Sequence, residues 1–301
     1  MIIGSGVLGA AAGLGGWGVL ADARVVPGRS VIDDLLGRCD IPGPPPTEAV
    51  PGRVVRSSFF SQHRNQSVNY MLAYPPKVAA GAKLPVCLML HGLGDDERQA
   101  FDGLGYHRLL AAATAAKVPP FVMASIEGGD GYWHPHEGDD PLGMLLDDFP
   151  PVLQQHGLPI NRFALLGWSM GGFGALVAAT ERPDRFAAVV ANAPALFDSY
   201  DDARAAHEGG FASEADWQRY GDITPRMIKL PATMLRPTVL RIDCGESDSF
   251  ASTVADLKER LPDPAVVHLS PGCHDGDFWR SVAKDQLALI GAALTPPKTK
   301  G

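Results

Sequence analysis

Residues 163–172 read Phe-Ala-Leu-Leu-Gly-Trp-Ser-Met-Gly-Gly, and this stretch decides the fold. Its apolar beginning is typical of a buried strand, and the small residues after Ser169 are typical of a helix that packs closely on its neighbours. Between the two, Gly167 to Gly171 fits the pattern G-x-S-x-G, in which a serine occupies a strained turn and glycine lets strand and helix approach. This context favours a sharp strand–serine–helix turn over the alternative that Ser169 is an ordinary helix N-cap.

Strand and helix patterns alternate on both sides of this turn. Two strands joined by a polar turn at residues 62–66 are predicted to pair antiparallel, whereas the later strands are short continuous apolar runs, typical of a buried parallel sheet. The alternation predicts an α/β fold, a mostly parallel central sheet with helices on both faces. Residues 195–235 lose clear periodicity and are expected to form a small cap. The expected strands are Val54–Ser61, Val68–Tyr74, Pro85–Leu90, Phe121–Ile126, Arg162–Trp168, Phe186–Ala191, Thr238–Asp243 and Ala265–Leu269.

The composition excludes several classes of protein. The 301 residues are 46% hydrophobic and 20% charged, with a formal net charge of −8. A nucleic-acid surface needs basic patches, so nucleic acid is not an expected partner. An anionic membrane face would also repel this chain, which leaves an N-terminal anchor as the only expected membrane contact. No cofactor is implied, and nothing in the sequence indicates the oligomeric state.

The first residues differ from the rest of the chain. Met1–Leu20 carries no charged side chain, and Ala21-Asp22-Ala23 after it has the form of a signal cleavage site. We expect residues 1–23 to be an export signal; the alternative is an uncleaved membrane anchor. Both interpretations place the body of the protein outside the cytoplasm. The expected organisation then has a proline-rich connector at 24–52, a main domain at 53–294 and a tail at 295–301.

A serine nucleophile needs a base, and the base needs an orienting acid, in the chain order serine, acid, histidine. His274 is the expected base because it follows the last strand at the carboxyl edge of the sheet, whereas His268 lies inside that strand and is expected to point into the sheet or a helix layer. Three acids, Asp243, Glu246 and Asp248, come before it. We expect Asp248, with Glu246 as the alternative, since Asp243 still belongs to a strand.

Two backbone N–H groups are expected to stabilise the oxyanion that forms on the substrate. One belongs to Met170, the residue after the nucleophile. The other is predicted to come from Leu93, because Gly92 and Gly94 on either side of it let the loop fold close to Ser169.

Four motifs together resemble the esterase D family: His91-Gly92-x-Gly94, the G-W-S-M-G-G turn at 167–172, Gly245-x-x-Asp248, and Gly272-x-His274-Asp275 followed by Phe278-Trp279. That family includes S-formylglutathione hydrolases, feruloyl esterases and secreted mycolyltransferases. The resemblance spans about residues 54–294 and implies an α/β-hydrolase fold. It also implies a serine carboxylesterase that acts on a small-molecule or lipid ester through an acyl-enzyme, with Ser169, Asp248 and His274 as its triad.

Two alternatives to ester hydrolysis stay open. The first is an acyltransferase of the mycolyltransferase type, which would move the acyl group to a sugar or another alcohol. The mycolyltransferases usually carry D-G-L where this chain has His91-Gly92-Leu93, and their acid is usually Glu, so the motifs argue against transfer. The second is an exported binding protein that keeps the fold without catalysis.

Several aromatic and histidine side chains are expected to contact substrate. Trp133, in the segment Tyr132–Glu137, is predicted to form an apolar pocket wall, and we prefer this interpretation to metal ligation by the two histidines of that segment. His91, Trp168 and Trp279 are the other expected substrate contacts. No metal site is predicted.

The four cysteines allow two interpretations. Cys244 ends one strand and Cys273 directly precedes His274, so a Cys244–Cys273 disulfide would tie the acid loop to the base loop in an oxidising compartment. The alternative is that both are buried thiols. Cys87 lies in an apolar strand and is expected to be a buried thiol, and Cys39 has no evident partner.

Overall fold

A computed structural model describes residues 38–39, 41, 49–79, 81–229, 238–261 and 265–295. The expected export segment 1–23, most of the connector 24–52, and the tail beyond Thr295 lie outside the described residues. No helix in the described part of the chain is long and apolar enough to cross a membrane.

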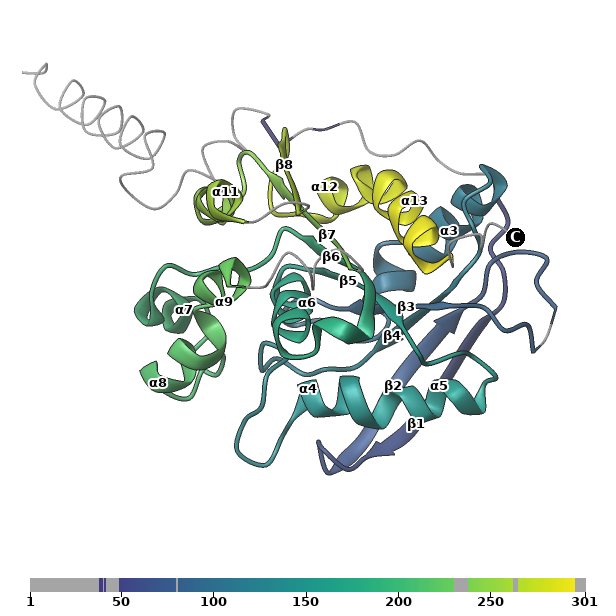
Figure 1. Cartoon of the computed structure of the whole chain (residues 1–301), viewed down its shortest axis with the longest axis horizontal. Coiled ribbons are helices and arrows are strands. Elements are labelled where there is room, and N and C mark those ends of the chain that lie inside the picture. Colours follow the sequence, from purple (N-terminus) through teal and green to yellow (C-terminus); the bar gives the residue numbers. More distant parts are fainter. Residues whose placement is uncertain are drawn as a thin grey trace, which may run out of the picture.

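The centre of the molecule is one eight-stranded sheet, with the strand order β1-β2-β4-β3-β5-β6-β7-β8 (Figure 1). The pairs β1–β2 and β2–β4 are antiparallel, and every later pair is parallel. The predicted mostly parallel sheet is therefore confirmed. The strands are β1 (Val54–Ser61), β2 (Gln66–Ala73), β3 (Val86–Leu90), β4 (Val122–Ile126), β5 (Phe163–Trp168), β6 (Phe186–Asn192), β7 (Val239–Gly245) and β8 (Val266–Ser270).

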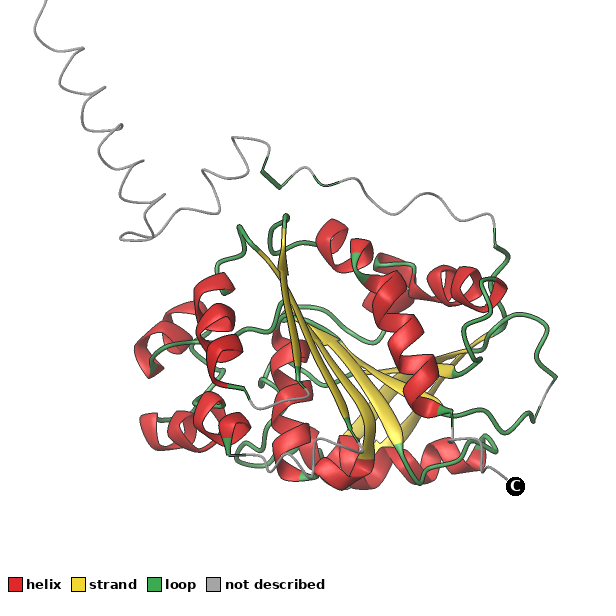
Figure 2. Ribbon diagram, turned by 45° about the horizontal axis from the view of Figure 1, so that its top comes forward, coloured by secondary structure: helices red, strands yellow, loops and turns green. Residues whose placement is uncertain are grey.

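Helices cover both faces of the twisted sheet, as predicted (Figure 2). Each face buries its own apolar cluster, which explains why the central strands are apolar on both sides. One face is covered by α5 (Phe149–Gln155), α6 (Met170–Glu181) and α11 (Ala251–Arg260). The other is covered by η1 (Gln99–Gly103), α3 (Tyr106–Ala115), α12 (Gly276–Ser281) and α13 (Ala283–Leu294).

Residues 144–155 form two helical segments. The π-helical turn η2 (Met144–Asp148) follows the short helix α4 (Pro141–Gly143), and α5 then begins at Phe149. Pro150 and Pro151 lie in the first turn of α5, where a missing N–H costs no helical hydrogen bond.

The segment after β6 forms the cap, which we define as residues 195–229. It contains α7 (Tyr200–Ala206), α8 (Glu214–Asp216), η4 (Trp217–Gly221) and α9 (Thr224–Ile228), although the sequence showed no clear periodicity there. These helices are too short for an amphipathic pattern to emerge. Phe211 and Tyr220 are buried in the same apolar cluster as α6, so the cap is packed onto the main domain.

The predicted Cys244–Cys273 disulfide is wrong. Cys273 is bonded to Cys39 instead, with 5.1 Å between their Cα atoms, while Cys87 and Cys244 are buried thiols. The register explains the error, because Cys244 pairs with Leu269 on β8 and Cys273 lies four residues farther along the chain. The disulfide therefore fastens the connector to the residue that precedes His274.

We predict that the denatured, unreduced protein exposes two titratable thiols and that peptide mapping joins Cys39 to Cys273. Reducing this bond is expected to lower the free energy of unfolding by about 2–4 kcal/mol, because it releases a long loop in the unfolded chain. Four titratable thiols, or a Cys244–Cys273 peptide, would contradict this pairing.

Candidate active site

The turn between β5 and α6 holds Ser169 in a strained conformation. Its φ of 55° and ψ of −122° are unusual for a residue with a side chain, and its hydroxyl makes no N-cap hydrogen bond. A Cβ on Gly167 would lie 2.1 Å from the carbonyl oxygen of Gly171, and a Cβ on Gly171 would lie 2.0 Å from that of Leu90. Only glycine fits at these two positions, which is what the motif predicted.

Ser169, His274 and Asp248 form one chain of hydrogen bonds. The Nε2 atom of His274 lies 2.8 Å from the Ser169 hydroxyl, and its Nδ1 atom lies 2.8 Å from Oδ2 of Asp248. The Asp248 side chain is fully buried, whereas Ser169 and His274 are partly exposed. The three residues expected from the sequence to act together are thus in contact, with a proton path from the serine to the imidazole.

The other two acids have different surroundings. Asp243 is buried, where its carboxylate accepts hydrogen bonds from Arg241 and from the Gln286 amide. Glu246 is exposed to solvent. The expectation for His268 is wrong, because β8 is the edge strand and the side chain of His268 is exposed.

Backbone hydrogen bonds join the acid loop to the base loop. The N–H of Glu246 donates to Ser270 and the N–H of Ser247 donates to Gly272, over 2.8 and 3.0 Å. The second oxygen of Asp248 accepts the N–H of Phe250 at 2.8 Å. These bonds hold the Asp248 carboxylate in the orientation in which its Oδ2 atom contacts His274.

The loop after β3, which was expected to supply an oxyanion donor, lies beside Ser169. Gly92 lies against the serine, since a Cβ on Gly92 would be 3.6 Å from that of Ser169. In this loop the N–H of Gly92 donates to Gln99 and the N–H of Gly94 donates to Asp130. Within the described residues, the N–H groups of Leu93 and Met170 have no acceptor.

Three of the four expected substrate contacts are completely buried, so for them the expectation is corrected. His91 donates from Nδ1 to the carbonyl of Gly92 and accepts the N–H of Gly128 at Nε2. Trp133 donates to the carbonyl of His91, and Trp168 donates to the side chain of Gln99. The three rings support the Gly92–Gly94 loop, and the size and apolar character of Trp133 had suggested a pocket wall.

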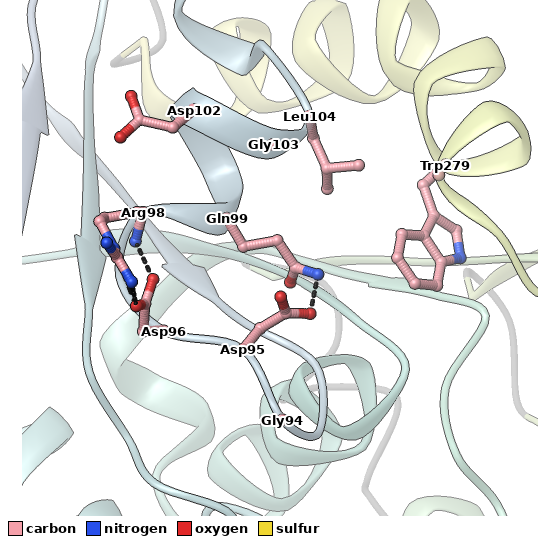
Figure 3. Close-up of a pocket in the computed structure, with 10 residues that line it drawn as sticks. Gly94, Asp95, Asp96, Arg98, Gln99, Asp102, Gly103, Leu104 and Trp279 are labelled. Atoms are coloured by element: carbon pink, nitrogen blue, oxygen red, sulfur yellow. Dashed lines mark hydrogen bonds and ion pairs between the residues drawn. The ribbon is translucent and has the colours of Figure 1, made fainter.

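The fourth expected contact, Trp279, does border a pocket (Figure 3). The cavity measures about 520 Å³ and lies between the Gly94–Leu104 segment and the start of α12. Trp279 stands across from Gln99 and Asp95, whose side chains are hydrogen-bonded to each other (Figure 3). Burial raises the pKa of Asp95, with a further contribution from Asp96 and Asp130, although His91 opposes this shift.

Two aromatic residues near His274 were missed by the sequence interpretation. Phe250 packs edge-on against the imidazole with 5.3 Å between ring centroids, and Phe197 of the cap packs on Phe250 at the same distance. Trp279 contacts His274 with ring centroids 5.5 Å apart. In the sequence, the only indication that Phe250 lies near His274 is its position two residues after Asp248. For Phe197 the sequence gives no such indication.

Comparison with known families agrees with this geometry. Residues 61–261 match the family model described as "Putative esterase", which is about two thirds of the chain. The chain belongs to this esterase family. As a member, it is an enzyme of the carboxylic ester hydrolase class.

The esterase also shares its fold with solved structures. A ferulic acid esterase aligns with a TM-score of 0.70 and 20% identity, covering 80% of this chain and 97% of that one. An S-formylglutathione hydrolase from Agrobacterium tumefaciens gives 0.64 and 20%, covering 83% and 99%. A ferulic acid esterase from Anaeromyces mucronatus gives 0.62 and 18%, covering 83% and 95%. At these identities the likeness establishes the α/β-hydrolase fold.

The geometry predicts which carboxylate matters for turnover. Asp248→Asn should lower kcat for ester hydrolysis by about 10⁴-fold, the effect of the same change in another triad enzyme, because the imidazole loses its orienting acceptor. Glu246→Gln should leave kcat within about twofold. Steady-state kinetics on p-nitrophenyl acetate measure both, and a large loss with Glu246→Gln alone would assign the role to Glu246.

Proposed function

We propose that the protein is a serine carboxylesterase that works through an acyl-enzyme, with Ser169, His274 and Asp248 as its triad. The single observation that carries this proposal is the pair of 2.8 Å contacts that joins the three side chains. In the first step, Nε2 of His274 takes the hydroxyl proton as Ser169 Oγ attacks the ester carbonyl carbon. Asp248 holds the imidazole by its Nδ1–H and stabilises the imidazolium.

The tetrahedral intermediate then collapses. Its oxyanion accepts hydrogen bonds from the N–H groups of Leu93 and Met170, and losing one such donor typically raises the barrier by about 3 kcal/mol. The imidazolium protonates the leaving alcohol, which leaves an ester on Ser169. Water, deprotonated by His274, releases the acid and restores the serine.

The substrate is a small-molecule or lipid ester. The pocket beside Trp279 is lined by Asp95, Asp96 and Asp102, and its wall at Gly94 continues the loop in which Gly92 lies against Ser169. Carboxylates accept hydrogen bonds from hydroxyl groups, so this pocket suits a polar alcohol portion better than an apolar chain.

The same pocket supports a second candidate, transfer of the acyl group to a hydroxyl-bearing acceptor such as a sugar. A tryptophan face next to carboxylates suits a ring that has an apolar face and a hydroxyl edge. The acceptor would replace water in the last step of the same mechanism.

We further propose that the enzyme is exported. The N-terminal pattern at 1–23 and the Cys39–Cys273 disulfide both support an oxidising compartment. In this organisation residues 24–52 are a connector that the disulfide ties to the catalytic domain at 53–294, and residues 295–301 are a tail.

We expect Ser169→Ala to abolish both ester turnover and covalent labelling by a fluorophosphonate probe, because no other described serine has His274 within hydrogen-bonding distance. Ser247→Ala, next to the acid, is the matched control and should still be labelled. Labelling of the Ser169 variant would overturn the assignment. A wild-type protein that is folded but neither labelled nor active would instead indicate a binding protein.

Hydrolysis and transfer differ in their products. With p-nitrophenyl esters of graded chain length, hydrolysis predicts that the free acid accounts for nearly all of the released nitrophenol, with or without added trehalose or glucose. Mass spectrometry of the products measures this partition. Acyl-sugar as the main product would favour the transferase.

A further inference from the structure

Three metal-ligand side chains meet where the cap touches the loop after β4. His134 and His136 come from that loop, and Asp216 ends α8 in the cap. One ligand atom from each lies within 4.8 Å of the other two. The pair of histidines alone was a weak motif in the sequence, and the third side chain comes from a segment some 80 positions later.

Both imidazoles have Nε2 against a carbonyl oxygen, and His134 has a second carbonyl oxygen near Nδ1. Nε2 of His136 lies 2.7 Å from the carbonyl oxygen of Gly131, and Nε2 of His134 lies 2.8 Å from that of Gly210. A carbonyl oxygen only accepts, so Nε2 of His136 carries the proton. His134 has a carbonyl oxygen at each ring nitrogen, and the shorter contact, 2.8 Å at Nε2 against 3.1 Å at Nδ1, assigns its proton to Nε2. Histidines that bind metal ions usually donate their other N–H to a carbonyl or carboxylate in this way.

Nδ1 of His134 faces an acceptor and not a donor. Its Nδ1 atom faces the carbonyl oxygen of Pro135 at 3.1 Å, so two electron-rich atoms oppose each other when Nε2–H serves Gly210. The side chain of His134 is completely buried, so bulk solvent does not reach this contact. A bound cation that accepts the lone pair of Nδ1 would relieve the repulsion between the two atoms.

The carboxylate of Asp216 is also oriented. Its Oδ2 atom accepts the N–H of Ala212 at 3.0 Å, which leaves Oδ1 for another partner. Its backbone N–H donates to the Ser213 hydroxyl that caps α8. His136 and Asp216 are only partly buried, so an ion can reach the cluster from solvent.

Aromatic rings fix the buried ligand. Phe211 and Tyr220, both from the cap, stack on His134 with centroid distances of 4.8 and 4.9 Å. Four rings in contact with one another, those of Phe211, Tyr132, Phe197 and Phe250, lie between His134 and His274. This spacing separates the cluster from the triad, so an ion bound there would act on the cap.

We propose that His134, His136 and Asp216 form a zinc site that fastens the cap to the loop after β4. Nδ1 of each histidine and Oδ1 of the aspartate would be three ligands of a tetrahedral ion, with water as the fourth. Nitrogen and carboxylate donors suit Zn²⁺, whose ligand distances of about 2.1 Å need the three atoms about 3.4 Å apart. The ligand atoms, which lie within 4.8 Å of one another here, would therefore have to move closer together on binding.

The test uses untagged protein that has been treated with chelator and dialysed. Wild type should bind one Zn²⁺ per chain by calorimetry, and zinc at about 100 times Kd should raise Tm by about 5 °C. Co²⁺ in its place should give the visible absorption of a tetrahedral site. His136→Ala and Asp216→Asn should each weaken zinc binding by about tenfold or more and remove the Tm shift.

Two exposed residues provide the controls. His268→Ala on β8 and Asp201→Asn on α7 should bind zinc and shift in Tm like wild type. Far-UV circular dichroism without metal should be the same for all variants, which separates loss of the site from loss of the fold. Absence of stoichiometric zinc in wild type would overturn the proposal, and so would unchanged binding in the His136 and Asp216 variants. Neither outcome bears on the proposed esterase mechanism, whose variants are different.

Discussion

The close approach of β5 and α6 is the constraint on which the rest of the site depends. Gly167 and Gly171 leave no room for a Cβ, and this contact forces the chain at Ser169 into a conformation with φ of 55°. Backbone hydrogen bonds hold that residue from both sides, with its N–H donating to Asn192 and its carbonyl accepting from Phe173 and Ala195. Because α6 is buried on all sides, the strain is stabilised by the packing of the whole domain.

Parallel strands bring the remaining groups to the same edge of the sheet. The loop after β3 lies against Ser169 through Gly92, while the loops after β7 and β8 pair with each other through their backbones. Side chains that looked like substrate contacts support these loops instead. His91 is an example: it is buried, and its ring nitrogens hold the loop on either side of it.

Two contacts between distant segments help to fasten the connector and the cap to the main domain. At one place the disulfide joins Cys39 to Cys273, next to the catalytic base of the proposed mechanism. At the other, rings of the cap pack around His134, where we place a zinc ion. In both cases a residue distant in sequence meets a loop that follows a strand. Such contacts have no periodic pattern, and for that reason neither partner could be paired from the sequence.

The sequence by itself determined the strand order along the chain, the two-sided covering of the sheet and the glycine-bounded turn at Ser169, because periodicity and steric demands are local. It also indicated His274 and Asp248, since each follows a strand that must end at the edge beside Ser169. Only the tertiary structure decided which acid is available: Asp243 is already bonded to Arg241 and Gln286. It likewise decided the partner of Cys273 and the burial of Trp133, because register and packing between distant segments are properties of the folded chain.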